Sequence, residues 1–275
     1  MATELRYLGK VVIVTGGTKG IGKGIVREFV LQGASVVFCA PESGEEQGKA
    51  IEQELQNCGA AGEAHFQICD VRYEKAIQNL VAVTIELYGR LDCLVNNVGI
   101  HPSNKTIDDF TAEDFRNLMA INAVSYFLAS KYALPYLRKT KGNIVNISSL
   151  SHVIGSKQSV TYGATKGAVS AMTKALAIDE SKNCVRVNSI SPSCIWTPAW
   201  AREASETPDP EATIQKGKDF QLMGRMGTPA EIAKAALFLA TDATFCTGCD
   251  LVASGGAELG FAHKSPFTPG CDSIN

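Results

Sequence analysis

The stretch that most restricts the fold is an apolar run, residues 11–14, followed directly by a glycine-rich segment, residues 15–22. Three valines and one isoleucine in so short a run favour a buried strand. A helical pattern of apolar residues follows and ends near Gly33. Glycines let a backbone approach a phosphate closely, and a helix N-terminus supplies N–H donors. The segment therefore predicts half of a βαβ unit with a phosphate-binding turn, or simply a tight strand–helix connection.

Short apolar runs alternate with helical patterns along the rest of the chain. This alternation predicts an α/β fold with a single Rossmann-like, doubly wound parallel sheet and helices on both faces. One dinucleotide-binding and catalytic domain is expected over residues 1–261. Residues from about 195 to 225 hold three prolines and two tryptophans, which favours a substrate lid. The polar residues 262–275 are expected to form a mobile tail.

Residues 162–166 read Tyr-Gly-Ala-Thr-Lys, which places Tyr162 and Lys166 one helical turn apart on one face. A free phenol has a pKa of about 10, and a neighbouring ammonium lowers the pKa of a phenol. Such a pair can exchange a proton with an alcohol or a carbonyl. An exposed helix pair without a chemical role is the alternative.

Polar and small residues follow several of the predicted strands. Residues 16–22, residues 96–99, Ser149 and Pro192 all stand at such positions. The carboxyl ends of parallel strands meet at one edge of the sheet, where ligands bind in doubly wound folds. Asp70 also follows a strand and either contacts an adenine or caps the next turn. These residues are expected to converge on one site.

These motifs resemble the short-chain dehydrogenase/reductase family over about residues 8–260, with Val98 and Ser193 as departures from its usual Ala and Gly. The resemblance implies that Asn122, Ser149, Tyr162 and Lys166 form the catalytic tetrad. Its implied cofactor contacts are Gly16, Thr18, Lys19, Gly20, Ile21, Gly22, Asp70, Val71, Asn97, Gly99, Tyr162, Lys166, Pro192, Ile195 and Thr197.

Within that family, the resemblance is to the type 14 branch of the 17β-hydroxysteroid dehydrogenases. It rests on residues 132–139, 143–150, 165–168, 195–198, 245–248 and 255–260. It implies NAD-dependent oxidation of the secondary hydroxyl of a 17β-hydroxysteroid to a ketone, by a cytosolic homotetramer. Relatives of this branch are also credited with oxidation of L-fucose, so a sugar is the alternative substrate. The candidate substrate contacts are His101, Ser149, Ser156, Tyr162 and Trp200.

In the expected mechanism, Tyr162 takes the hydroxyl proton, Lys166 lowers the pKa of Tyr162, and Ser149 holds the substrate oxygen. Asn122 is predicted to kink its helix and to bind a water in a proton relay to Lys166.

An apolar cleft would suit a steroid, and its candidates are Ile154, Trp196, Trp200, Leu222 and Met223. Polar candidates for a sugar site are His101, His152, Ser156 and Lys157. A nicotinamide-binding sensor or scaffold without turnover is the non-enzyme alternative.

The end of the second predicted strand bears on the choice of cofactor. NAD preference usually rests on a carboxylate there, which binds the ribose hydroxyls and repels a 2′-phosphate. Ala40 stands in that place and is followed by Pro41 and Glu42, while Lys19 could attract the phosphate. Residues 40–42 include no Arg for a bidentate grip. We therefore predict use of NAD with NADP also accepted.

Composition excludes some other classes of protein. The net charge of −2 and the lack of a basic block argue against a nucleic-acid partner. No apolar stretch approaches the roughly 20 residues of a membrane span. Nine cysteines suit a reducing cytosol. Cys246 and Cys249 form a Cys-x-x-Cys, but no second pair accompanies them, so no metal site is expected.

Overall fold

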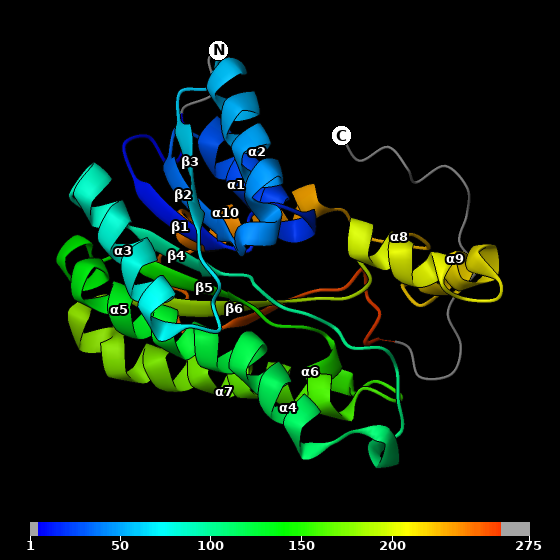
Figure 1. Cartoon of the computed structure of the whole chain (residues 1–275). Coiled ribbons are helices and arrows are strands. Elements are labelled where there is room, and N and C mark those ends of the chain that lie inside the picture. The colour runs from blue at the N-terminus through cyan, green and yellow to red at the C-terminus, as the bar shows by residue number, and fades with distance from the viewer. Residues whose placement is uncertain (1–4, 260–275) are drawn as a thin grey trace.

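The computed structural model of the protein describes residues 5–259. Its centre is a seven-stranded sheet in the order β3-β2-β1-β4-β5-β6-β7 (Figure 1). Every neighbouring pair of strands is parallel. The strands are β1 (Val11–Thr15), β2 (Ser35–Ala40), β3 (Glu63–Ile68), β4 (Cys93–Asn96), β5 (Asn143–Ile147), β6 (Arg186–Pro192) and β7 (Asp250–Ala253). The predicted parallel α/β sheet is confirmed.

Helices connect the strands and cover both faces of the sheet (Figure 1). The α-helices are α1 (Gly20–Leu31), α2 (Glu45–Asn57), α3 (Glu74–Tyr88), α4 (Ala112–Met119), α5 (Ser125–Thr140), α6 (Ser151–Ile154), α7 (Val160–Glu180), α8 (Pro198–Ser205), α9 (Pro210–Asp219) and α10 (Pro229–Ala240). None of the helices found within residues 5–259 is both long and apolar enough to cross a membrane. The predicted tail, residues 262–275, lies outside the described residues.

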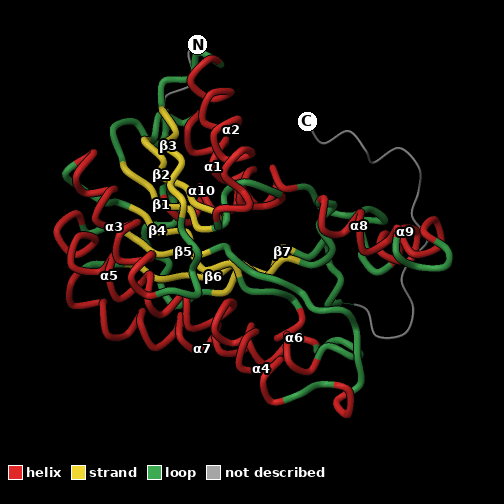
Figure 2. Tube along the Cα trace, in the orientation of Figure 1, coloured by secondary structure: helices red, strands yellow, loops and turns green. Residues whose placement is uncertain are grey.

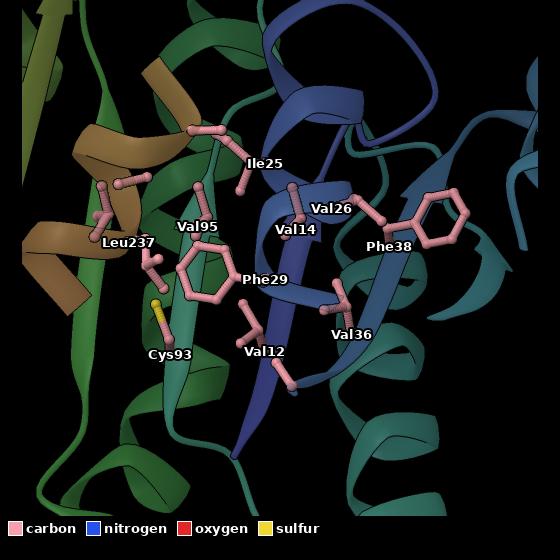
Figure 3. Close-up of a cluster of buried hydrophobic side chains, with 14 of the residues drawn as sticks. Val12, Val14, Ile25, Val26, Phe29, Val36, Phe38, Cys93, Val95 and Leu237 are labelled. Carbon is pink, nitrogen blue, oxygen red and sulfur yellow. The ribbon is translucent and has the colours of Figure 1, made fainter. Parts of the chain in front are cut away.

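Strand β1 shows how alternating residues separate the two cores. Val12 and Val14 pack with residues of α1 and α10, such as Phe29 and Leu237 (Figure 3). Val11 and Ile13 belong to the opposite core, which α3, α5 and α7 cover. Because side chains alternate across a strand, each apolar run fills both cores. This explains why the predicted strands read as continuous apolar runs.

The strand order reverses between β1 and its two neighbours. The chain moves outward from β1 to β2 and β3, and then returns to place β4 on the other side of β1. Ligands of doubly wound folds bind outside the carboxyl ends of the strands at this reversal. Helices α8 and α9 stand beyond that edge of the sheet, apart from the other helices (Figures 1 and 2).

Two segments near the cofactor edge have a distinctive local structure. A π-helical turn, Ala120–Val124, separates α4 from α5, at the place where Asn122 is predicted to kink its helix. A capping box of Thr111 and Asp114 begins α4. The segment predicted as a substrate lid, about 195–225, contains two helices, α8 and α9. Each begins with a proline after a capping side chain, which fits the preference of proline for the first helical turn.

Candidate active site

The glycine-rich turn after β1 is tied to the end of β4. The Asn97 Nδ2 donates to the carbonyl oxygens of Thr15 and Gly16, at 2.9 and 3.1 Å. A Cβ at Gly22 would lie 2.1 Å from the oxygen of Gly16, so only glycine fits there. Gly16 and Gly20 have φ values of +67° and +52°, a region that favours glycine. The turn is therefore preformed, and Asn97 holds it.

The N-terminus of α1 fits a phosphate group. Lys19 precedes the helix and makes no side-chain capping hydrogen bond in the described chain. The first N–H groups of a helix lack intrahelical acceptors, and together with the helix dipole they attract anions. The Cβ position of Gly20 lies 3.3 Å from the Cγ2 of Thr197, which caps α8. The turn and the segment before α8, far apart in sequence, thus border one crevice.

The other predicted cofactor residues lie at the same edge. Val71, Pro192 and Ile195 are buried, and Gly99 follows β4. Asp70 accepts a hydrogen bond from the backbone N–H of Arg72 at 3.0 Å and pairs with its guanidinium. These hydrogen bonds from Arg72 lower the pKa of Asp70. Asp70 therefore caps its turn, which is one of the two roles expected for it.

Lys166 is buried beneath the crevice. Its Nζ donates to the carbonyl oxygen of Ile147 at 2.8 Å and lies 5.8 Å from the ring centroid of Tyr162. Burial lowers the pKa of Lys166 to about 8, because removing an ammonium from water disfavours its charge. The Cβ position of Gly99 lies 3.3 Å from Nζ, so Gly99 leaves space above the ammonium.

The phenol of Tyr162 differs from the expectation. Burial raises the pKa of Tyr162, and a hydrogen bond with Ser149 offsets part of that rise. The Lys166 ammonium lies over the Tyr162 ring and donates to the carbonyl of Ile147 rather than to the phenol, and its predicted lowering of the Tyr162 pKa stays a prediction. The predicted contact of Ser149 with the substrate oxygen also stays a prediction.

Asn122 lies in the π-helical turn between α4 and α5, so the predicted helix irregularity is present. Its Oδ1 accepts a hydrogen bond from the Ile100 N–H at 3.0 Å, and its Nδ2 donates to the Ile100 carbonyl at 2.9 Å. Nδ2 also lies 3.2 Å from the Thr165 hydroxyl. The fully buried carboxamide thus holds the loop after β4 against α7. Its predicted role in a water relay stays a prediction.

A cleft of about 700 Å³ opens beside Tyr162. His101 lines it from the loop after β4, and its ring centroid lies 4.5 Å from that of Tyr162. Burial lowers the pKa of His101, while the charge of Glu203 acts in the opposite direction. Of the predicted substrate residues, all five line the cleft: His101, Ser149, Ser156, Tyr162 and Trp200.

The apolar cleft expected for a steroid is only partly assembled. Ile154 and Trp200 line the cleft, but Trp196, Leu222 and Met223 do not. Leu222 covers Gly256, and Met223 faces a second, smaller cavity, because the chain turns back towards β7 after α9. The polar candidates His152 and Lys157 also lie off the cleft.

Sequence reasoning missed a charged group on α8. Arg202, Glu203 and Glu206 line the cleft beside Trp200. Their helical spacing after the cap at Thr197 could have indicated a shared face. Within residues 5–259, no group of three or more His, Cys, Asp or Glu side chains could hold a metal ion.

Known proteins resemble this chain over nearly its whole length. A family model described as enoyl-(acyl carrier protein) reductase matches residues 16–258. L-fucose dehydrogenases of Bos taurus and Mus musculus are 54% and 53% identical over 265 residues. The alignments cover 96% of this chain and 95% and 94% of those proteins, respectively. The structure of an aldohexose dehydrogenase of Thermoplasma acidophilum has a TM-score of 0.84 and 30% identity, and covers 95% of this chain and 99% of its own.

These likenesses support the predicted family but favour the sugar alternative over the predicted steroid branch. The family model, the parallel sheet and the residues gathered beside Tyr162 agree with one another. The chain is an oxidoreductase that belongs to the short-chain dehydrogenase/reductase family.

Proposed function

We propose that the protein is an NAD(P)-dependent dehydrogenase that oxidises a hydroxyl group of a small sugar, with L-fucose as the first substrate to test. The observation that carries this proposal is the polar lining of the cleft beside Tyr162. His101, Ser156 and Glu203 bring an imidazole, a hydroxyl and a carboxylate to it from three different segments. A sugar has several hydroxyls that need such fixed partners. Two L-fucose dehydrogenases and an aldohexose dehydrogenase among the similar proteins support the same substrate class.

In the proposed reaction, the Tyr162 phenolate accepts the proton of the substrate hydroxyl. The Ser149 hydroxyl, which hydrogen-bonds with Tyr162, also binds the substrate oxygen. Positive charge on Lys166 favours the phenolate, and Asn122 supports the site by fixing Ile100 beside it. Each of these roles is assigned from the geometry and the family resemblance together.

A nicotinamide dinucleotide, when bound, supplies the acceptor for the hydride. The residues around the glycine-rich turn fit its phosphates, because the N-terminus of α1 has no side-chain cap. Thr197 and Ile195 would border its nicotinamide end, and Asp70 and Val71 its adenine end. NAD is the proposed cofactor, with NADP accepted.

A hydroxysteroid is the second candidate substrate. Ile154, Trp200 and Phe220 give the cleft some apolar surface. The charged residues of α8 reduce its fit to a steroid, because burial of an unpaired charge is costly. The homotetramer, the cytosolic location and the lid from about 195 to 225 remain predictions.

The deciding experiment measures nicotinamide absorbance with NAD and NADP against a panel of L-fucose, other aldoses and 17β-hydroxysteroids. Turnover of L-fucose at least ten times more efficient than that of any steroid, compared as kcat/KM, is expected. A preference for steroids would reverse the assignment of substrate. No turnover of any alcohol, with cofactor binding intact, would favour the sensor or scaffold alternative.

A further inference from the structure

The imidazole of His152 points away from the cleft into the protein. Its Nδ1 lies 2.7 Å from the carbonyl oxygen of Ser149, and its Nε2 lies 3.4 Å from the Oδ2 of Asp250 on β7. The side chain is only 15% exposed. Both ring nitrogens thus lie near oxygen atoms that can accept hydrogen bonds. His152 therefore links the residue that touches Tyr162 to the last strand of the sheet.

Asp250 is itself held by two hydroxyl groups of β6. Ser189 donates to its Oδ1 at 2.7 Å, and Ser191 donates to Oδ1 and Oδ2 at 2.8 and 2.9 Å. Ser189 and Asp250 are also direct neighbours in the strand register. Donors on both oxygens favour a carboxylate with a fixed orientation. Asp250 is thus a rigid anchor on the sheet.

Ser149 is hydrogen-bonded to the helix that carries His152. Its Oγ accepts a hydrogen bond from the Ser151 N–H at 3.2 Å, and its carbonyl accepts from the His152 N–H at 3.2 Å. Both donors belong to α6, a helix of four residues with none fully buried. The backbone N–H groups of Ser148 and Leu150 donate to Ile190 and Pro192 of β6, at 2.7 and 2.9 Å. Because α6 has little apolar packing of its own, the link from His152 to Asp250 adds a restraint beyond these two hydrogen bonds.

We propose that His152 is a positioning residue, which, anchored by Asp250, fixes the Ser149 backbone and so aims the Ser149 hydroxyl at Tyr162 and the substrate oxygen. The inference rests on the proposed function, since it gives Ser149 a role in that reaction. Small displacements of a group that contacts the reacting atoms reduce turnover strongly without weakening the binding of a distant cofactor. His152 is therefore expected to act on kcat rather than on the KM of the cofactor.

The test compares three substitutions of His152 in the full-length protein with NAD and L-fucose. His152→Ala is expected to lower kcat about tenfold and to leave the KM for NAD unchanged. His152→Asn should recover part of this loss, because its amide nitrogen lies at the depth of Nδ1 and can still donate to Ser149, although it no longer reaches Asp250. His152→Gln should not rescue kcat, because its longer side chain carries the amide towards Asp250.

The substitution Asp250→Asn tests the same contact between His152 and Asp250 from the side of the carboxylate. It should lower kcat in the wild-type background and cause no further loss in His152→Ala, because the two residues act as one unit. His65→Ala is the matched control. Its Nδ1 also pairs with a carboxylate, Glu52 at 3.2 Å, but on β3, outside the cleft. It should leave kcat unchanged.

A second measurement needs no substrate, so it tests the role of His152 separately from the proposed function. The ionisation of Tyr162 is measured as the ultraviolet absorbance difference between each protein and its Tyr162→Phe counterpart. Because the Ser149 hydrogen bond lowers the pKa of Tyr162, its loss in His152→Ala should move this titration to higher pH. If wild-type protein oxidises no sugar, the proposed function fails, and this titration still decides the role of His152.

Three results would overturn the positioning role. The first is an unchanged titration of Tyr162 in His152→Ala, and the second is a kcat of His152→Ala within twofold of the wild type. The third is an equal loss of kcat in the Asn and Gln variants together with weaker cofactor binding, which would indicate a general structural role.

Discussion

The two sides of the cleft are built in different ways. The inner side is lined by Ser149 and Tyr162 and is backed by side chains held by the sheet and by α7, such as Lys166, which is 3% exposed. The outer side is lined by α8, in which only Ala204 is buried, and by Phe220 just after α9. The inner side therefore has the packing and the hydrogen bonds to fix atoms, and the outer side does not.

This difference in packing suits the two sides of the cleft to different proposed roles, proton transfer and substrate recognition. Proton transfer requires groups held within hydrogen-bond reach, and Tyr162 and Ser149 on the inner side meet that requirement. Recognition of the substrate can tolerate a less restrained surface, and Trp200, Arg202 and Glu203 lie on the outer side. Substitutions on the inner side should therefore alter kcat or stability, and those on the outer side should alter KM.

The largest effect is expected from Tyr162→Phe on the inner side. Loss of the phenol removes the proton acceptor but keeps the ring, so kcat should fall by about 10²–10⁴ with little change in cofactor binding. Steady-state kinetics and a cofactor titration measure the two quantities. Tyr136→Phe on α5, outside the cleft, is the matched control. Near-normal turnover of Tyr162→Phe would remove Tyr162 from the proposed mechanism.

Lys166 should leave a signature in the pH dependence of stability. Its pKa falls from 10.5 to about 8 on folding. Between these two pH values the unfolded chain binds a proton that the folded chain does not, so the free energy of unfolding gains a term that rises with pH. The rise is on the order of 3 kcal/mol, from about 1.4 kcal/mol for each pKa unit.

Urea denaturation of wild type and Lys166→Met at pH values on both sides of 8 measures this term. Lys166→Met should lack the rise, while Lys174→Met, at an exposed position of the same helix, should keep it. Identical pH profiles for wild type and Lys166→Met would contradict a buried lysine with a lowered pKa.

On the outer side, Glu203→Gln should raise the KM for the sugar about tenfold and leave kcat nearly unchanged, since a charged hydrogen bond to a sugar hydroxyl is lost. The control is Glu211→Gln on α9, because Glu211 does not line the cleft. A selective fall in kcat would show that α8 takes part in the chemistry, and the distinction between the two sides would fail.

The smallest effect concerns the cofactor. Ala40 is buried at the end of β2 and offers no carboxylate to the ribose. NADP should therefore be accepted within about tenfold of NAD, or about 1.4 kcal/mol. Ala40→Asp should widen the gap in favour of NAD, as measured by kcat/KM for both cofactors. A strong NADP preference in the wild type would point instead to Lys19 or Arg72 as a phosphate partner.

The sequence by itself determined the parallel sheet, because strands such as β1 and β2 are short apolar runs and helical patterns lie between the strands. It also predicted five candidate substrate residues that line the cleft, since Ser149 and Tyr162 belong to recognisable motifs. The turn at residues 15–22 was predictable for the same reason, because its glycines are required by local backbone geometry.

Only the tertiary structure decided the surroundings of these residues. The pKa of Tyr162 is raised because burial outweighs the hydrogen bond with Ser149, and burial depends on the whole fold. His152, three residues after Ser149, pairs with Asp250 almost a hundred residues later because β5, which precedes His152, and β7, which holds Asp250, both pair with β6. Spacing along the chain fixes local motifs, whereas desolvation and contacts between distant segments depend on packing in three dimensions.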